Sequence, residues 1–402
     1  MRILFADKFP ERQLDEIRAR GHDCELQPDL AAADLPGVIA GFNVLVVRST
    51  KVEADTFAAA DSLELVVRAG SGYNTIDVVA AAERGVWVCN VPGKNAVAVA
   101  ELAFGLLLAI DRNIPDNVAD LRAGKWDKSR YQKAQGLFGR VAGVVGLGAI
   151  GLAFADRAHA FGMEVHAVAK ARGEEATRRL AAIGVTYHPD LGDLAGAVDV
   201  LSFHVPAHPT TRGMIGADLL RHLRPGAIII NTARGDLVDE EALLAALDRG
   251  VRAGLDVYPD EPAAGTGEFS SALAQHPNVY GTHHIGASTE QAQHAIADEV
   301  VGIVAAFESG EVRNSVNLDS PRGTSTLLVR HRSEVGVPAG VLKSLSEAGI
   351  NVEQMENRVL SGGRAAATLQ ITGVIDDGVR AGLMADPQVI AVSGEQRDEE
   401  LQ

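Results

Sequence analysis

The sequence has few cysteines, few cations for its length and no long apolar run. Two cysteines in 402 residues, Cys24 and Cys89, cannot supply a disulfide framework, which favours a reducing compartment. The longest apolar stretches, residues 102–110 and 141–155, are shorter than the roughly eighteen residues of a membrane span. The apolar run after Met1 is too short for a signal peptide. We therefore expect a cytoplasmic protein that does not enter a membrane.

The chain is also acidic, with 37 Lys and Arg against 53 Asp and Glu and a formal net charge of -16. This charge repels a phosphate backbone, so nucleic acid is not an expected partner. An anionic small ligand would have to be held by cations gathered locally. Only 4% of the residues are aromatic but 42 are glycine, which is typical of an α/β protein, and the length suits two or three domains.

Short apolar runs alternate with helical stretches through the first ninety residues, which predicts a parallel sheet covered on both faces. A buried helix over residues 95–110 follows, and the alternation starts again at Arg140, so we place a domain boundary near residue 95. The second series predicts a doubly wound sheet of six strands. These strands are expected at residues 141–145, 164–168, 199–204, 227–231, 253–258 and 279–283, followed by a helix over 288–309.

A third compact unit follows the turn residues around Asp319. Strands are predicted at residues 324–329, 352–360, 364–372 and 389–392, with helices after the first and third. This βαββαβ order is the ferredoxin-like arrangement.

A dinucleotide fingerprint follows the strand over residues 141–145. Gly146, Gly148 and Gly151 have the GxGxxG spacing and lead into a helical run. The first glycine makes the tight turn, the second lets the backbone approach a pyrophosphate, and the third lets the helix pack on the strand. The alternative is a tight strand-to-helix turn without a ligand.

The acid that usually reads the adenosine ribose is missing. The second strand of this unit ends in Ala169-Lys170-Ala-Arg172, where an Asp or Glu would favour a free 2′-hydroxyl. We expect NAD as cofactor, with NADP possible, and the missing acid leads to the hypothesis of relaxed cofactor choice or an NADP preference, because Ala169 offers no charge that repels a 2′-phosphate. The alternative is that the two cations are solvated and NAD is used.

Three polar residues follow successive strands at the edge where open α/β sheets bind ligands. They are Arg234, Glu261 and His284. The histidine would accept a hydroxyl proton, the carboxylate would orient its ring, and the arginine would clamp a substrate carboxylate. Each residue alone is more often a loop or capping residue, so the hypothesis rests on their joint placement.

The motifs around these residues resemble those of the D-isomer-specific 2-hydroxyacid dehydrogenases. They are Asn231-Thr-Ala-Arg-Gly-Asp-Leu-Val-Asp-Glu-Glu, Gly254-Leu-Asp-Val-Tyr-Pro-Asp-Glu-Pro and His284-Ile-Gly-Ala-Ser-Thr. The resemblance covers roughly residues 1–315 and implies the catalytic set Arg234, Glu261 and His284. His283 is the neighbouring candidate, but the motif begins at His284, and alternation along a strand would point the two rings to opposite sides.

The resemblance implies a flavodoxin-like substrate domain (residues 1–95 and 286–318) and a Rossmann domain (residues 96–285). Besides the glycines, it implies cofactor contacts at Ala149, Ile150, Ala169, Lys170, Val205, Thr232, Ala233, Asp256, Ile285, Gly286 and Ala287. It implies substrate contacts at Arg48, Ser49, Gly70, Ser71, Gly72 and Asn95, and Lys51 and Arg68 lie near enough in sequence to add phosphate contacts. No metal is expected.

The third unit, residues 324–395, resembles an ACT domain, which binds amino acids at subunit interfaces. An L-serine effector is implied at His331 and Asn351, whereas Ser333 and Val335 depart from the effector-binding pattern. A stabilising module without a ligand is the alternative. Family members with one such tail oxidise 3-phosphoglycerate to 3-phosphohydroxypyruvate for serine biosynthesis, which is the implied activity.

Two other functions stay open. One is reduction of glyoxylate, hydroxypyruvate or another 2-oxo acid, and the other is a nucleotide-sensing corepressor without catalysis. The helix over residues 95–110 resembles the dimerisation element of the family, so we expect a homodimer or homotetramer.

Overall fold

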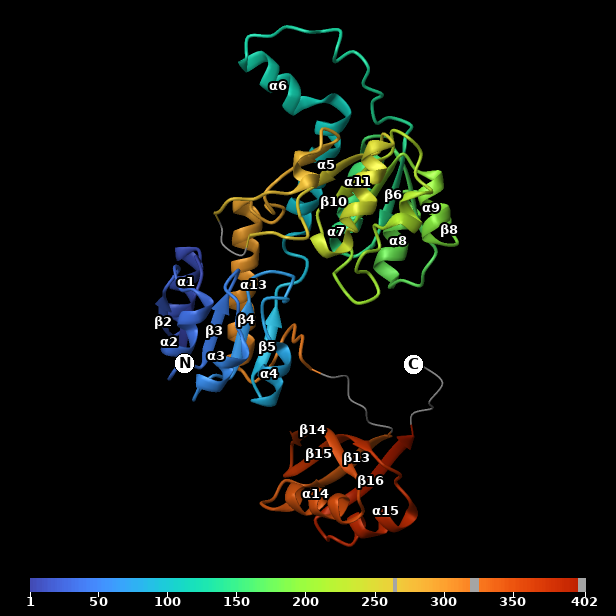
Figure 1. Cartoon of the computed structure of the whole chain (residues 1–402). Helices are drawn as coiled ribbons and strands as arrows, with labels where there is room; N and C mark the ends of the chain where they lie inside the picture. Colours follow the sequence, from blue (N-terminus) through green and yellow to red (C-terminus); the bar gives the residue numbers. More distant parts are fainter. Residues whose placement is uncertain (263–265, 319–324, 397–402) are drawn as a thin grey trace. The chain divides into compact units, whose positions relative to one another are not determined.

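The structure, a computed structural model, describes residues 1–262, 266–318 and 325–396 (Figure 1). It forms two compact units, Met1–Asn317 and Leu318–Gln402. None of the helices in the described ranges has both the length and the apolar character needed to cross a bilayer. The predicted domain limits within the first unit, and the limits of the ACT-like span, stay predictions.

The first sheet has five parallel strands in the order β2-β1-β3-β4-β5. This is the flavodoxin-like order, as the family resemblance implied. The strands are β1 (Arg2–Phe5), β2 (Asp23–Leu26), β3 (Val44–Val47), β4 (Leu65–Arg68) and β5 (Trp87–Asn90). Strand β2 is not marked by an apolar run in the sequence, because its residues, Asp-Cys-Glu-Leu, include none that is fully buried.

Helices cover both faces of this sheet, and one of them comes from far along the chain. They are α1 (Glu11–Ala19), α2 (Leu35–Val38), α3 (Ala54–Ala59), α4 (Val78–Glu83) and α13 (Glu290–Glu308). Ile296, Val300 and Val304 of α13 share a buried core with Ile3 and Phe5 of β1, and Figure 1 shows α13 beside these strands. The chain therefore returns to its first sheet after building the second.

The second sheet has seven parallel strands in the order β12-β11-β10-β9-β6-β7-β8, so the expected number of six was wrong. They are β6 (Val141–Val145), β7 (Glu164–Val168), β8 (Thr186–His188), β9 (Val200–Phe203), β10 (Ile228–Asn231), β11 (Arg252–Leu255) and β12 (Val279–Gly281). The additional strand, β8, has three residues and exposes Thr186 and Tyr187, so it lacks a buried run. The order reverses between β6 and β9, where doubly wound sheets bind their ligands.

Apolar cores lie on both faces of the second sheet. Its helices are α5 (Ala96–Arg112), α6 (Ile114–Arg122), α7 (Ala149–Ala160), α8 (Glu174–Ala182), α9 (Leu191–Ala197), α10 (Ala217–Leu220), α11 (Glu240–Asp248) and α12 (Ala272–Gln275). Phe104 and Leu107 of α5 pack with Phe154 of α7 in one of these cores. The helix α5 thus begins after the first sheet and is buried against the second.

The second unit of the structure, which contains the third unit expected from the sequence, has an antiparallel sheet with the strand order β14-β15-β13-β16. Its elements are β13 (Ser325–Arg332), α14 (Val337–Glu347), β14 (Asn351–Leu360), β15 (Arg364–Thr372), α15 (Asp377–Met384) and β16 (Val389–Gln396). The predicted βαββαβ order is confirmed, although Thr324, where the first strand was expected to begin, lies outside the described residues. Leu327 and Val329 of β13 pack with Val341 and Leu345 of α14 and with Leu383 of α15.

Candidate active site

The glycine turn after β6 has the geometry that a bound pyrophosphate requires. Gly146 has a φ of +92°, and a Cβ there would lie 2.6 Å from the His204 carbonyl oxygen. A Cβ at Gly151 would overlap the Gly146 carbonyl, whereas one at Gly148 would meet open space. Gly148 is also the N-cap residue of α7. Gly146 and Gly151 therefore allow tight packing, and Gly148 leaves the positive end of the helix accessible to an anion.

The predicted cofactor contacts after the neighbouring strands lie beside this turn or at the same edge of the sheet. Val205, which follows β9, would contact a Cβ at Gly146. Thr232, which follows β10, is buried, and its hydroxyl has no hydrogen-bond partner within the described residues. A buried hydroxyl without a partner costs free energy unless a ligand or water satisfies it. These residues therefore fit a bound dinucleotide.

The ribose corner beyond β7 carries no acid at the expected position. The Ala169 N–H donates to the His188 carbonyl oxygen at 2.8 Å, and Lys170 is exposed. The Arg172 guanidinium donates to the Lys170 and Val168 carbonyl oxygens at 2.8 and 2.5 Å. Arg172 is therefore partly committed to its own loop, and Lys170 is the cation directed to solvent.

His284 and Glu261 form a hydrogen-bonded pair. His284 Nδ1 lies 2.6 Å from Glu261 Oε2, and Glu261 Oε1 accepts the Tyr258 N–H at 2.8 Å. Burial alone would raise the pKa of the Glu261 carboxyl, but these two hydrogen bonds and the charges of His284 and Arg234 outweigh it. The net pKa lies below the usual value, so Glu261 is a carboxylate at neutral pH and accepts a proton-bearing Nδ1. This leaves Nε2 available for proton transfer.

The backbone at His284 differs from the prediction. Strand β12 ends at Gly281, so side-chain alternation does not separate His283 from His284, and that part of the argument was wrong. His284 instead has a φ of +51°, in the left-handed region that non-glycine residues rarely adopt. The contact with Glu261 is what distinguishes His284 from its neighbour.

The buried carboxylate of Asp256 holds the loop that carries His284. Its Oδ1 accepts from the Ile285 N–H at 2.9 Å and the Thr282 hydroxyl at 2.6 Å. Its Oδ2 accepts from the Gly286 N–H at 2.9 Å. Asp256 therefore positions the strained segment, and its expected contact with the nicotinamide amide stays a prediction.

Arg234 follows β10 of the second sheet, and its side chain reaches the Gly70–Gly72 loop after β4 of the first sheet. Its guanidinium occupies the space where a Cβ of Gly72 would lie, so a side chain at residue 72 would force the guanidinium to shift. One guanidinium nitrogen donates to the Ala233 carbonyl oxygen at 2.6 Å. Burial lowers the pKa of Arg234 against the opposing charges of Glu261 and Asp236.

Arg68 adds a second buried guanidinium, packed where a Cβ of Gly70 would lie. Burial lowers its pKa to about 10, and the charges of Arg234 and Arg48 add to this effect. The Arg68 Nε is buried and has no hydrogen-bond partner among the described residues. Arg48, Arg68 and Arg234 therefore form a cationic cluster at the Gly70–Gly72 loop, which is the local gathering of cations that an acidic chain needs.

The other predicted substrate residues are ordered by hydrogen bonds around this cluster. The Ser71 hydroxyl donates to Asn95 Oδ1 at 3.0 Å, and the Asn90 amide donates to the Ser71 carbonyl oxygen at 2.6 Å. Ser49 is exposed, and its N–H donates to Asp7 Oδ2 at 3.1 Å. Asp7 was not predicted as a site residue, although it follows β1 at the same edge at which the other site residues were found.

The predicted effector residues do not form one site within a chain. His331 is buried, with Nδ1 at 2.7 Å from the Arg332 carbonyl oxygen and Nε2 at 3.0 Å from Asn357 Oδ1. It pairs with Ala365 of β15, whereas the exposed Asn351 pairs with Thr372. These two positions of β15 are separated by about 23 Å at roughly 3.3 Å per residue. One small effector cannot contact both residues of the same chain.

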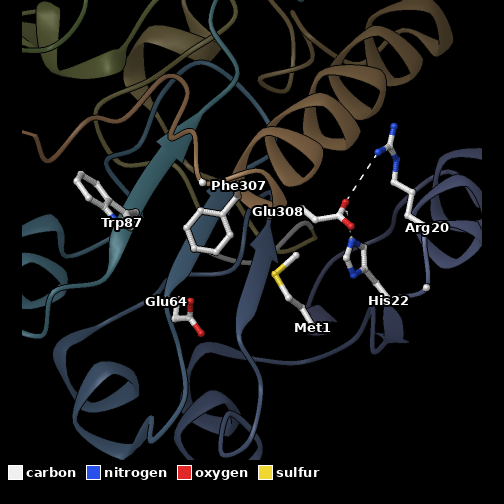
Figure 2. A pocket seen from close by; sticks show the side chains of 9 residues that line it. Met1, Arg20, His22, Glu64, Trp87, Phe307 and Glu308 are labelled. Atoms are coloured by element: carbon white, nitrogen blue, oxygen red, sulfur yellow. Dashed lines mark ion pairs between the residues drawn. The ribbon is translucent and has the colours of Figure 1, made fainter. Parts of the chain in front are cut away.

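A separate hollow of about 650 Å³ lies at the opposite, amino-terminal edge of the first sheet (Figure 2). Glu308 is ion-paired there with Arg20 at 3.9 Å and His22 at 3.6 Å. Met1, Glu64, Trp87 and Phe307 also line it. The ion pairs join α13 to the end of α1, which gives this hollow a structural explanation without a ligand.

Comparisons with known proteins agree with the fold. Residues 104–286 match the family model described as D-isomer specific 2-hydroxyacid dehydrogenase, NAD binding domain. A hydroxypyruvate reductase of Thermotoga maritima is 42% identical over 271 residues, which are 67% of this chain and 85% of that protein. The chain therefore belongs to the D-isomer specific 2-hydroxyacid dehydrogenase family.

Two other similar proteins have activities that differ from each other. A D-3-phosphoglycerate dehydrogenase of Methanocaldococcus jannaschii is 38% identical over 319 residues, 79% of this chain, and the chain spans only 59% of that protein. An NADPH-dependent glyoxylate/hydroxypyruvate reductase of Sinorhizobium meliloti, solved with NADP and malonate, gives a TM-score of 0.64 at 33% identity. That match covers 78% of this chain and 96% of the other.

His204, whose carbonyl packs against Gly146, predicts a pH dependence of stability. The His204 Nε2 lies 2.9 Å from Ser202 Oγ, and burial lowers the pKa of this histidine to about 3. An unfolded histidine has a pKa near 6.5, so between these values only the unfolded state binds the proton, and stability falls as the pH falls. We expect a loss of about 2 kcal/mol in unfolding free energy from pH 7 to pH 5, nearly all of it below about pH 6.5, where each pH unit costs roughly 1.4 kcal/mol.

Urea unfolding of the wild type and of His204→Gln at both pH values measures this loss. The variant should lose less stability between pH 7 and pH 5, whereas the exposed His222→Gln should behave as the wild type. An equal loss in His204→Gln and the wild type would contradict the assignment.

Proposed function

We propose that this protein oxidises D-3-phosphoglycerate to 3-phosphohydroxypyruvate, the first reaction of phosphorylated serine biosynthesis. The observation that carries the proposal is the convergence of the His284–Glu261 pair with the cluster of Arg48, Arg68 and Arg234. This arrangement supplies a base for one hydroxyl proton and cations for two anionic groups. The similarity to several D-3-phosphoglycerate dehydrogenases supports the same activity.

The residues divide the work of the reaction. His284 Nε2 accepts the hydroxyl proton while the hydrogen on the same carbon leaves as hydride, and Glu261 stabilises the resulting imidazolium. The bound nicotinamide supplies the hydride acceptor. Arg234 and the N–H groups of Ser71 and Gly72 would hold the substrate carboxylate, because the Gly70 N–H already donates to the Arg68 carbonyl oxygen at 2.8 Å. The planar guanidinium would polarise the forming carbonyl. Arg48 and Arg68, with the exposed Lys51, would hold the phosphate.

A second candidate is a reductase of glyoxylate or hydroxypyruvate. The relatives from Thermotoga maritima and Sinorhizobium meliloti favour it, as does a ribose corner without an acid. The cationic cluster favours the phosphorylated substrate, because a second, buried guanidinium at Arg68 has no role with glyoxylate.

A substrate panel separates the two activities. We expect kcat/KM for reduction of 3-phosphohydroxypyruvate to exceed that for hydroxypyruvate and glyoxylate at least tenfold. His284→Ala should lower kcat on the best substrate by about a hundred- to ten-thousandfold, the usual contribution of a general base. The neighbouring His283→Ala should stay within about threefold of the wild type. A higher kcat/KM for glyoxylate would favour the second candidate.

The cofactor preference is a separate proposal. With Lys170 exposed and Ala169 in place of an acid, the protein would use NADP as well as NAD. Ala169→Asp should lower the NADP/NAD ratio of kcat/KM at least tenfold, because a carboxylate repels the 2′-phosphate and accepts from the free ribose hydroxyl. Ala171→Asp, exposed two residues further on, is the matched control. A hundredfold preference of the wild type for NAD would contradict the proposal.

We propose that the second unit is an ACT domain and that L-serine binds it between two copies of the chain. The separation of His331 from Asn351 within one chain supports a shared site in a homodimer or homotetramer.

The exposed apolar side chains of Leu121 on α6 and Trp126 beyond it offer a contact surface for such an assembly. The unpaired thiols of Cys24 and Cys89 are consistent with a cytoplasmic location.

Serine inhibition is tested on the full-length protein. Millimolar L-serine should lower the wild-type rate, and Asn351→Ala should abolish this response because the amide contact is lost. Gln354→Ala, an exposed change on the same strand, should leave the response intact. A wild type unaffected by serine would contradict regulation and leave the domain a stabilising module.

A further inference from the structure

The carboxylate of Asp7 fills an anion-binding turn at the edge of the substrate cluster. Its Oδ2 accepts the consecutive N–H groups of Arg48, Ser49 and Thr50 at 2.7, 3.1 and 3.1 Å. Consecutive backbone N–H groups that converge in this way form a nest with a preference for anions. The protein therefore supplies the occupant of this nest from the end of its own first strand.

The same carboxylate is the acid whose charge acts on Arg68 within the buried cluster. The charges of Arg234 and Arg48 lower the pKa of Arg68, whereas the charge of Asp7 acts in the opposite direction. Asp7 thus offsets part of the repulsion among three guanidinium groups. It also lowers the positive potential offered to an incoming anion.

A second tether shows that the loop does not depend on Asp7 alone. The Thr50 hydroxyl donates to the carbonyl oxygens of Ala6 and Leu30 at 3.3 and 3.4 Å. Removal of Asp7 should therefore loosen the segment carrying Arg48 without unfolding the domain.

We propose that Asp7 is a positioning residue that fixes the Arg48–Thr50 loop by filling its nest and sets, through its charge, how strongly the site selects a doubly charged anionic group. This inference rests on the proposed function for the identity of that group. With the nest occupied, those three N–H groups are not available to the substrate. Its anionic groups are then held by guanidinium groups and by the Gly70–Gly72 loop, and the selectivity between phosphorylated and unphosphorylated 2-oxo acids depends on the charge of Asp7.

Two substitutions separate the two roles. Asp7→Asn keeps an oxygen that accepts N–H groups but removes the charge, so the loop should stay in place. We expect kcat within about threefold of the wild type, and KM for 3-phosphohydroxypyruvate at least threefold lower. KM for hydroxypyruvate, which carries fewer charges, should fall less. Asp7→Ala empties the nest and should raise KM for both substrates about tenfold.

Amide hydrogen exchange measures how firmly the Arg48–Thr50 loop is held in the absence of substrate. The N–H groups of residues 48–50 should exchange at least tenfold faster in Asp7→Ala and at the wild-type rate in Asp7→Asn. Asp55→Asn, which removes an exposed charge from α3, controls for net charge and should change neither exchange nor KM. A kinetic change in both Asp7 variants that is equal in size and direction would overturn the inference.

Unchanged exchange in Asp7→Ala would also overturn it. The proposed function fails separately, if the wild type prefers glyoxylate over 3-phosphohydroxypyruvate. In that case the exchange rates and KM for glyoxylate still decide whether Asp7 positions the loop.

Discussion

The approach of Arg234 to Gly72 is the contact on which the candidate site depends. It joins the carboxyl end of β10 in the second sheet to a loop of the first, and a side chain at residue 72 would displace the guanidinium from its present position. A guanidinium buried this way stays charged because its intrinsic pKa is far above neutrality. The cost of burying the charge would be offset by an anion bound beside it, which is the role proposed for a substrate carboxylate.

The His284–Glu261 pair depends on a strained backbone conformation at His284 itself. His284 adopts a left-handed backbone, and Asp256 stabilises it with two N–H contacts immediately downstream and one hydroxyl contact upstream. Such a conformation persists because its surroundings over-determine it. Asp256, which was expected to contact the cofactor, thus also stabilises the backbone conformation of His284.

The sequence predicted the elements whose residues are buried and the site residues that follow strands. Both parallel sheets, the glycine turn and the pairing of Glu261 with His284 could be anticipated because apolar runs and sheet topology fix where strands end. Strands β2 and β8 could not, since their exposed residues lack such runs. Asp7 and the backbone of His284 depend on contacts between distant segments, which no local pattern records. The distance between His331 and Asn351 likewise follows from strand register, which the sequence pattern left open.

The chain passes between its first two sheets twice, once before α5 and once before α13. The two passages lie side by side, because a Cβ at Gly286 would be 3.4 Å from Val99 of α5. Any relative rotation of the two sheets would therefore pivot near His284 and Asn95, where these connections lie. Groups carried by β5 are close to this pivot, while those carried by β3 lie two strands further out, at about 4.8 Å per strand. Such a rotation would displace Arg48 more than the His284–Glu261 pair, so the far end of a bound substrate would be affected more than the carbon near His284.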